Sequence, residues 1–285
     1  MHGRIDIIEF LKIIVFGIVE GFTEWLPISS TGHMILLEEI IPLKMTEDFW
    51  NVFKVVIQLG AILAVVVLYF KKLNPFDGGK TGRQRRETLI LWFQIACACL
   101  PVALIGMPLD DWMDAHLHNG FVVAAMLIVY GILFIMVENR RGDMDFPIQR
   151  VNQMDLRTAI YIGCFQLLAL VPGTSRSGVT IIGAMLLGCS RASAAEFTFF
   201  LGIPVMFGAS LLKVVKFFLK SERMFTGTEF FYLIAAMVIA FVVSVYSIKF
   251  LMGYIKKNNF KLFGYYRIVL GVIVVAFFTV QTLLE

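Results

Sequence analysis

Charged residues are scarce in this chain of 285 residues. They make up 16% of it, while apolar residues make up 59%; a soluble domain carries roughly a quarter charged residues. This scarcity excludes a soluble globular protein and indicates an integral membrane protein with several spans. The net charge of +4 is small and no basic stretch is interleaved with aromatic residues, so nucleic acid is not an expected partner.

Cysteine is also sparse. All four cysteines lie in apolar stretches, where a buried apolar role is expected: Cys97, Cys99, Cys164 and Cys189. The first two are separated by one residue, which lacks the two-residue gap of zinc or redox pairs. A cleavable signal peptide is not expected either, because the first ten residues contain Asp6 and Glu9 and no small-residue cleavage site follows.

Long apolar runs are what the chain does have. A membrane-spanning helix takes about 20 residues, and such helices are expected near 51–70, 89–107, 120–137, 194–212, 230–248 and 266–284. Two further apolar stretches, 7–41 and 158–190, are each interrupted by a polar cluster and leave halves too short to cross alone. We expect each to form a helix–loop–helix hairpin that enters and leaves on one side, with its loop shielded by protein or a water-filled cavity.

The two halves of the chain share this pattern. Adding 146 to a residue number places Gly17 on Gly163, Glu20 on Gln166, Ser29 on Ser175, Thr31 on Ser177 and Gly32 on Gly178. Residues 1–140 and 141–285 then each hold one hairpin and three spans, and an odd number of spans inverts the second copy. The expected fold is a single all-α polytopic membrane domain, with six transmembrane helices and two re-entrant hairpins in an inverted-topology repeat.

The charges of the loops predict an orientation. Lysine and arginine gather in 71–88, 138–157 and 249–261, which places these loops in the cytoplasm. The acidic loop 108–119 and both termini are then outside. The loop 213–229 is basic and violates the rule, because the alternation of spans places it outside as well.

The polar cluster of the second half contains an arginine at membrane depth. Such a residue is costly unless it is paired or wetted, so it marks a functional site. Arg176 offers a fork of donors suited to phosphate oxygens, and a helix that restarts near Gly178 points its positive end at the same place. The other candidate phosphate-binding residues here are Gly173, Thr174, Ser175, Ser177 and Thr180. The alternative is an arginine that only caps a helix or pairs with an acid for assembly.

The polar cluster of the first half contains paired acids. Glu20 and Glu24 share one face of a helix, and adjacent carboxylates repel unless a cation lies between them, one is protonated, or Arg176 approaches. Mg²⁺ and Ca²⁺ prefer oxygen ligands of this kind. We expect Glu20 and Glu24 to hold such a divalent cation, or one of them to act as a base. The alternative is a polar helix face that looks at water.

Hydroxyls and a histidine follow these acids. Ser29, Ser30 and Thr31 are candidate nucleophiles; Ser30 is assigned the attack, or the orientation of an attacking water, and the other two the binding of phosphate. His33 lies one helical turn after Ser30 and is the candidate base or acid.

These residues belong to two long strings. The strings are Glu20-Gly-Phe-Thr-Glu-Trp-Leu-Pro-Ile-Ser-Ser-Thr-Gly-His33 and Pro172-Gly-Thr-Ser-Arg-Ser-Gly-Val-Thr180. Both closely resemble the signatures of the undecaprenyl-diphosphate phosphatases of the bacitracin-resistance type. The resemblance implies a bacterial plasma-membrane enzyme that removes the terminal phosphate of undecaprenyl diphosphate and so recycles the lipid carrier of cell-wall synthesis. It also implies bacitracin resistance, and catalytic roles for Glu20, Glu24, Ser30, His33 and Arg176.

A transporter or flippase for a phosphorylated lipid or an anion is the competing class, since inverted repeats with broken helices are typical of transporters. A purely structural membrane protein explains none of the buried polar groups. Membrane lipid is an expected partner, and glycine-rich spans could form a homodimer interface. The loop charges favour a site that opens to the extracytoplasmic side.

Overall fold

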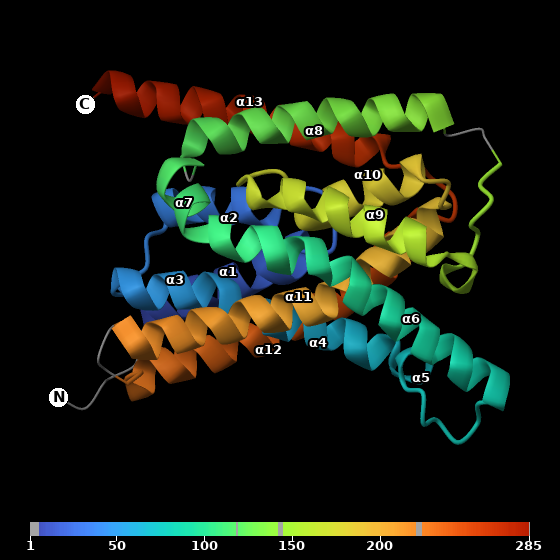
Figure 1. The fold of residues 1–285 in the computed structure, drawn as a ribbon. Coiled ribbons are helices and arrows are strands. Elements are labelled where there is room, and N and C mark those ends of the chain that lie inside the picture. The colour runs from blue at the N-terminus through green and yellow to red at the C-terminus, as the bar shows by residue number, and fades with distance from the viewer. Residues whose placement is uncertain (1–5, 118, 142–144, 221–223, 285) are drawn as a thin grey trace.

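The computed structural model describes residues 6–117, 119–141, 145–220 and 224–284. Regular structure within these ranges is helical (Figure 1). Pairing of β type in the same ranges is confined to one bridge between Ile148 and Cys189. The predicted all-α polytopic class is therefore confirmed.

Six helical runs among the described residues are long and apolar enough to cross a membrane. Two of the runs combine two elements: Glu47–Leu68 contains α3 (Glu47–Val56) and α4 (Gln58–Leu68), and Gly82–Gly106 contains α6 (Gly82–Pro101) and a π turn (Val102–Gly106). Two runs are whole helices, Gly120–Arg141 (α8) and Gly227–Tyr254 (α12). The last two are parts of helices: Arg191–Leu219 of α11 (Arg191–Lys220) and Lys261–Leu283 of α13 (Lys261–Leu284). All six predicted spans are found. Most extend beyond the apolar runs because the helix continues into polar ends, as at Arg140 and Arg141 of α8.

The two interrupted stretches form two pairs of packed helices. In the first, α1 (Ile7–Thr23) and α2 (Ser30–Ile40) flank residues 24–29, here called the first loop. In the second, α9 (Leu156–Gln166) with a 3₁₀ turn (Leu167–Leu170) and α10 (Arg176–Leu186) flank residues 171–175, the second loop. The remaining short elements are α5 (Phe70–Leu73), α7 (Met107–Leu117) and a 3₁₀ turn (Val151–Gln153). The re-entrant path of the pairs through a membrane stays a prediction.

Side-chain caps explain where several helices begin. Thr81 and Gln84 at the start of α6 form a reciprocal capping box, and Thr226 and Glu229 form another before α12. At the other end of α6, Pro101 has no N–H to donate, and the chain widens into the π turn directly after it.

The helices are arranged in layers around the broken pairs (Figure 1). The helices α8 and α13 run side by side on one face, α2, α9 and α10 lie beneath them, and α3, α4, α11 and α12 form the opposite face. The helix α1 packs along α12, as α9 packs along α6. In Figure 1, α1 begins and α13 ends at one end of the molecule, and the basic segment 71–88, which runs from α5 into α6, lies at the other end. Which end faces the cytoplasm stays a prediction.

Glycines bring the helices of these layers into close contact. A Cβ added to Gly60 of α4 would lie 2.0 Å from the carbonyl oxygen of Met237 on α12. A Cβ on Gly163 of α9 would lie 2.1 Å from the carbonyl oxygen of Ala98 on α6. Small residues at such crossings let helix backbones approach within a membrane.

Replacing Gly60 by Ala is expected to destabilise the protein, because α4 must move away from α12. Overpacking of this kind costs about 1–3 kcal/mol. The measurement is the thermal midpoint of unfolding in detergent micelles. Gly253→Ala on α12 is the control, since no atom lies within 4 Å of an added Cβ there. Equal midpoints for the two variants would contradict this account of the contact.

Candidate active site

The two loops end in the same local structure. Ser29 and Ser175 have φ values of 73° and 72°, and within the described ranges they are the two non-glycine residues with positive φ. Each caps the helix that follows: Ser29 Oγ accepts from Gly32 N at 3.2 Å, and Ser175 Oγ accepts from Gly178 N at 3.1 Å. A backbone held in this region stores about 1–3 kcal/mol of strain, which is typical of functional sites.

A cavity of about 120 Å³ lies between the loops. Its lining includes the first residues of α2 and of α10, so two helix N-termini with their partial positive charges meet there. The lining residues are Glu24, Ser30, Thr31, Gln58, Ala169, Val171, Pro172, Gly173, Ser175, Arg176, Ser177, Val205, Met206 and Ala209. A cavity built this way favours an anion.

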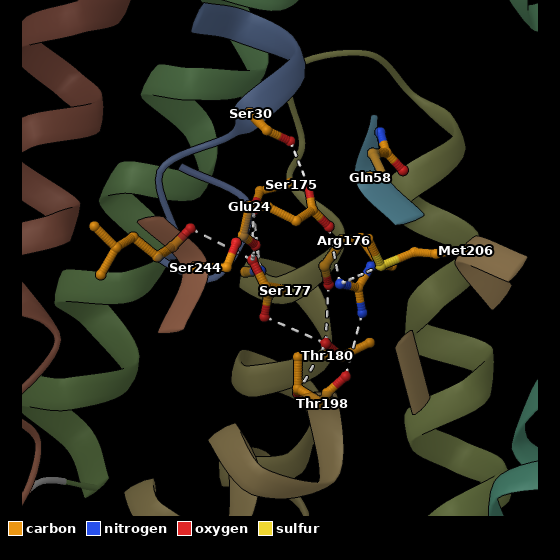
Figure 2. Close-up of polar contacts among 12 residues, drawn as sticks. Glu24, Ser30, Gln58, Ser175, Arg176, Ser177, Thr180, Thr198, Met206 and Ser244 are labelled. Carbon is orange, nitrogen blue, oxygen red and sulfur yellow. Dashed lines mark hydrogen bonds and ion pairs between the residues drawn. The ribbon is translucent and has the colours of Figure 1, made fainter. Parts of the chain in front are cut away.

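Glu24 joins the two halves of the chain at this cavity (Figure 2). One carboxylate oxygen accepts from Ser30 Oγ at 2.6 Å, and the other accepts from Arg176 Nη2 at 2.9 Å. The side chains of Arg176 and Glu24 are 13% and 7% exposed. A hydroxyl, a carboxylate that can take its proton and a cation that orients the carboxylate form a nucleophile–base–orienter arrangement.

The guanidinium of Arg176 is fixed on several sides. Its Nη1 donates to the carbonyl of Thr198 on α11 at 3.2 Å, and Nη2 also lies 3.5 Å from Met206 Sδ. Its carbon lies 6.0 Å from the centre of the Trp25 ring, in cation–π range. These contacts hold the fork of donors at the cavity.

Hydroxyls next to this arginine connect the elements around it. Ser177 Oγ donates to the carbonyl of Glu24 at 3.1 Å and so links α10 to the first loop. Thr198 Oγ1 donates to Thr180 Oγ1 at 2.9 Å, and Thr180 Oγ1 donates in turn to the carbonyl of Arg176 at 2.9 Å. Thr180 therefore holds the backbone of Arg176 next to Thr198 (Figure 2). Thr180 is not part of the cavity lining.

The predicted site residues divide into those at the cavity and those behind it. The cavity brings together Glu24, Ser30, Thr31, Gly173, Ser175, Arg176 and Ser177. The residues outside its lining are Glu20, Ser29, His33, Thr174, Gly178 and Thr180.

His33 Nδ1 lies 2.7 Å from the carbonyl of Ser29, so this nitrogen carries the proton, and Nε2 lies 2.7 Å from the Tyr266 hydroxyl.

The acids can be tested as ligands for a divalent cation. Both oxygens of Glu24 are already bonded, whereas Glu20 is 1% exposed and its Oε1 has no hydrogen-bond partner. Among the residues described, no group of three or more His, Cys, Asp or Glu side chains could hold a metal ion. Mg²⁺ needs only one or two carboxylates when substrate phosphates complete its shell. Glu20 lies outside the cavity lining, so the two acids would hold a cation only together with a phosphorylated ligand whose oxygens complete its shell.

Sequence reasoning missed several residues of this region. Thr198 and Met206 hold Arg176, and Tyr266 bonds His33. Arg267 on α13 is fully buried and bonds carbonyls of both loops. An arginine in an apolar run is itself a signal of function. The expected span 266–284 placed Arg267 at its edge, and that signal was lost.

Comparison with known proteins identifies the family. The profile described as "Bacitracin resistance protein BacA" matches residues 13–273. A protein of Desulfitobacterium hafniense named undecaprenyl-diphosphatase is 56% identical over 279 residues, 98% of this chain and 99% of its own. Proteins of the same name are 55% identical in Streptococcus thermophilus, over 96% of this chain and 95% of the relative, and 53% identical in Enterococcus faecalis, over 93% and 96%. The chain therefore belongs to the bacitracin resistance protein BacA family.

Proposed function

We propose that this chain is an undecaprenyl-diphosphate phosphatase, which releases undecaprenyl phosphate and inorganic phosphate in the bacterial plasma membrane. The single observation that carries the proposal is the chain of contacts from Ser30 Oγ through Glu24 to Arg176 at a cavity with two helix N-termini. The matched relatives bear the name of this activity. Recycling of the lipid carrier and resistance to bacitracin follow from the same reaction.

The proposed chemistry begins with the diphosphate in the cavity. Arg176 and the N–H groups of α2 and α10 bind its oxygens and stabilise the charge that develops during transfer. Ser30 Oγ passes its proton to Glu24 and bonds the terminal phosphorus, and the bond from this phosphorus to the bridging oxygen breaks. Water then displaces Ser30 from phosphorus, and Glu24 returns the proton to Ser30 Oγ.

We assign to His33 the role of general acid, which supplies the proton that the leaving oxygen takes up. Its Nδ1 is held by the carbonyl of Ser29, which leaves Nε2 as the atom that exchanges a proton. This nitrogen bonds the Tyr266 hydroxyl, so His33 must turn or pass the proton through that hydroxyl. With both ring nitrogens protonated at the start, His33 would give the Nε2 proton to the bridging oxygen in the first step and regain one from the attacking water in the second.

Glu20 and Glu24 would hold the divalent cation, Mg²⁺ or Ca²⁺, when the substrate binds, and Glu24 would give up this role when it accepts the proton of Ser30. The cation would supply positive charge to the phosphate oxygens. Glu20→Gln is expected to raise the cation concentration for half-maximal activity by at least about tenfold, since one of two anionic ligands is lost. The measurement is phosphate release during a titration with Mg²⁺ and with Ca²⁺ after chelation. Glu87→Gln, at an exposed pair with Arg83, is the control. An unchanged titration would remove Glu20 from the cation site.

Phosphate release from the purified chain in detergent, supplied with undecaprenyl diphosphate, tests the function itself. Release that depends on the protein is the expected result. A flippase would instead move the intact lipid across a vesicle without releasing phosphate. That outcome would replace the hydrolase by the transporter.

We also propose that the site opens to the extracytoplasmic side. In support, α1 begins at the end of the molecule opposite the basic segment 71–88, which runs from α5 into α6 (Figure 1). Thr31 lines the cavity and is exposed. In a background without the four native cysteines, Thr31→Cys is expected to react from outside the cell with a membrane-impermeant thiol reagent. Arg83→Cys at the start of α6 is expected to resist it, and the reverse pattern would place the opening in the cytoplasm.

A further inference from the structure

Among the residues that the structure describes, one arginine is fully buried, and the proposed reaction does not use it. Arg267 lies in the first half of α13 and is 0% exposed. Burial of a cation without an anion is costly, so such residues are rare unless they have a role. Its hydrogen-bond partners within the described part of the chain are neutral backbone carbonyls, and none is a carboxylate.

The carbonyls that Arg267 binds belong to both loops. Nη2 donates to Gly173 and Thr174 of the second loop, at 2.9 Å each, and Nη1 donates to Pro27 of the first loop at 3.2 Å. Longer contacts of 3.4 and 3.5 Å reach the carbonyls of Met126 and Leu127 on α8. One guanidinium therefore joins the two loops to each other and to a spanning helix.

The position of this link matters for the cavity. The first loop begins with Glu24 and leads into Ser30, and the second loop leads into Arg176. Arg267 also lies close to the start of α10, since a Cβ on Gly178 would be 3.3 Å from Nη1. Its charge is therefore held directly behind a helix N-terminus that faces the cavity, in an environment where charge acts strongly.

We propose that Arg267 is a positioning residue for the phosphatase site. It holds the first loop against the second so that the Ser30–Glu24 pair and Arg176 face one cavity, and it adds a positive charge behind the phosphate-binding helix end. The proposal deepens the proposed function and rests on it. A displacement of about 1 Å in such a site can lower a rate about 100-fold.

The kinetic test compares Arg267→Met, Arg267→Lys and Arg191→Met. Arg191 forms an ion pair with buried Glu138, at 2.6 Å, and lies outside the cavity lining. For Arg267→Met we expect kcat for undecaprenyl diphosphate to fall about 100-fold with KM within threefold. Arg267→Lys keeps the charge with fewer donors, and we expect a fall of about tenfold. Arg191→Met is expected to lower the thermal midpoint while kcat per folded molecule stays within threefold.

A kcat within threefold of wild type in Arg267→Met would overturn the proposal. So would a loss that follows the folded fraction, as expected for Arg191→Met. If Arg267→Met does not fold, Arg267→Lys decides: a kcat at least fivefold lower at an unchanged thermal midpoint supports the role, and a wild-type kcat overturns it.

A spectroscopic readout tests the loop link without catalysis. Trp25 lies in the first loop, is 0% exposed and contacts the guanidinium of Arg176. In a background with Trp50, Trp92 and Trp112 replaced by Phe, we expect Arg267→Met to raise acrylamide quenching of Trp25 at least twofold, and Arg191→Met to leave it unchanged. Equal quenching in both variants would overturn the link. If the wild type released no phosphate, the proposed function would fail, and this measurement would still report on Arg267.

Discussion

Arg176→Ala is expected to lower phosphate release from undecaprenyl diphosphate by about 1000-fold, the cost of losing a principal donor to developing charge. The substitution removes the fork of donors at the cavity and also the partner of Glu24 at 2.9 Å. The carboxylate would then be free to turn away from Ser30. The loss should appear mainly in kcat, because the charge to be stabilised is greatest in the transition state.

Arg176→Lys separates charge from geometry in this experiment. A lysine keeps the cation but cannot reach Glu24, the Thr198 carbonyl and a phosphate with one planar group. We expect the rate of Arg176→Lys to exceed that of Arg176→Ala by less than about tenfold. Arg83→Ala is the control, because the Arg83 side chain is 89% exposed. An Arg176→Ala protein that folds and keeps a wild-type rate would remove the phosphate-binding role.

Ser30→Ala is expected to abolish turnover, with a loss of at least about 10,000-fold, as for other nucleophiles that act as a unit with their base. The substitution removes the hydroxyl that bonds Glu24 at 2.6 Å, and no proton remains for that carboxylate to accept. Stability should change little, since Ser30 is only partly buried.

Trapping complements this kinetic measurement. Acid quench during turnover of the ³²P-labelled diphosphate should leave label on Ser30 in the wild type and none in Ser30→Ala. Ser247→Ala on α12 is the control, because its hydroxyl donates to the carbonyl of Val243 within its own helix and it lies outside the cavity lining. Full activity of Ser30→Ala would exclude Ser30 as the attacking group.

Much of the architecture could be predicted because membrane helices are encoded locally. Runs of apolar residues must exceed a minimum length to cross the hydrocarbon, and all six were found. The approach of Arg176 to Glu24, 152 residues away in sequence, is one of the three alternatives that the sequence left open for the paired acids, because a buried cation and a buried acid each need a partner. The inverted repeat of 1–140 and 141–285 stays a prediction, which the matching conformations of Ser29 and Ser175 support.

The contacts that escaped prediction have partners without a sequence signature. Arg267 binds backbone carbonyls, and every residue carries one. Thr198 reaches Thr180 through a hydroxyl pair, and His33 meets Tyr266 across 233 residues. Residue types alone cannot select such pairs, because many serines, threonines and tyrosines would serve equally well.

The place of Arg267 in the last helix also affects how the protein matures. The ribosome makes both loops long before it makes Arg267, so a nascent chain already contains Ser30, Glu24 and Arg176 while the bonds from Arg267 to the two loops are still missing. We expect phosphate release to stay slow throughout synthesis and to reach its full rate only when the final helix has packed against the two loops.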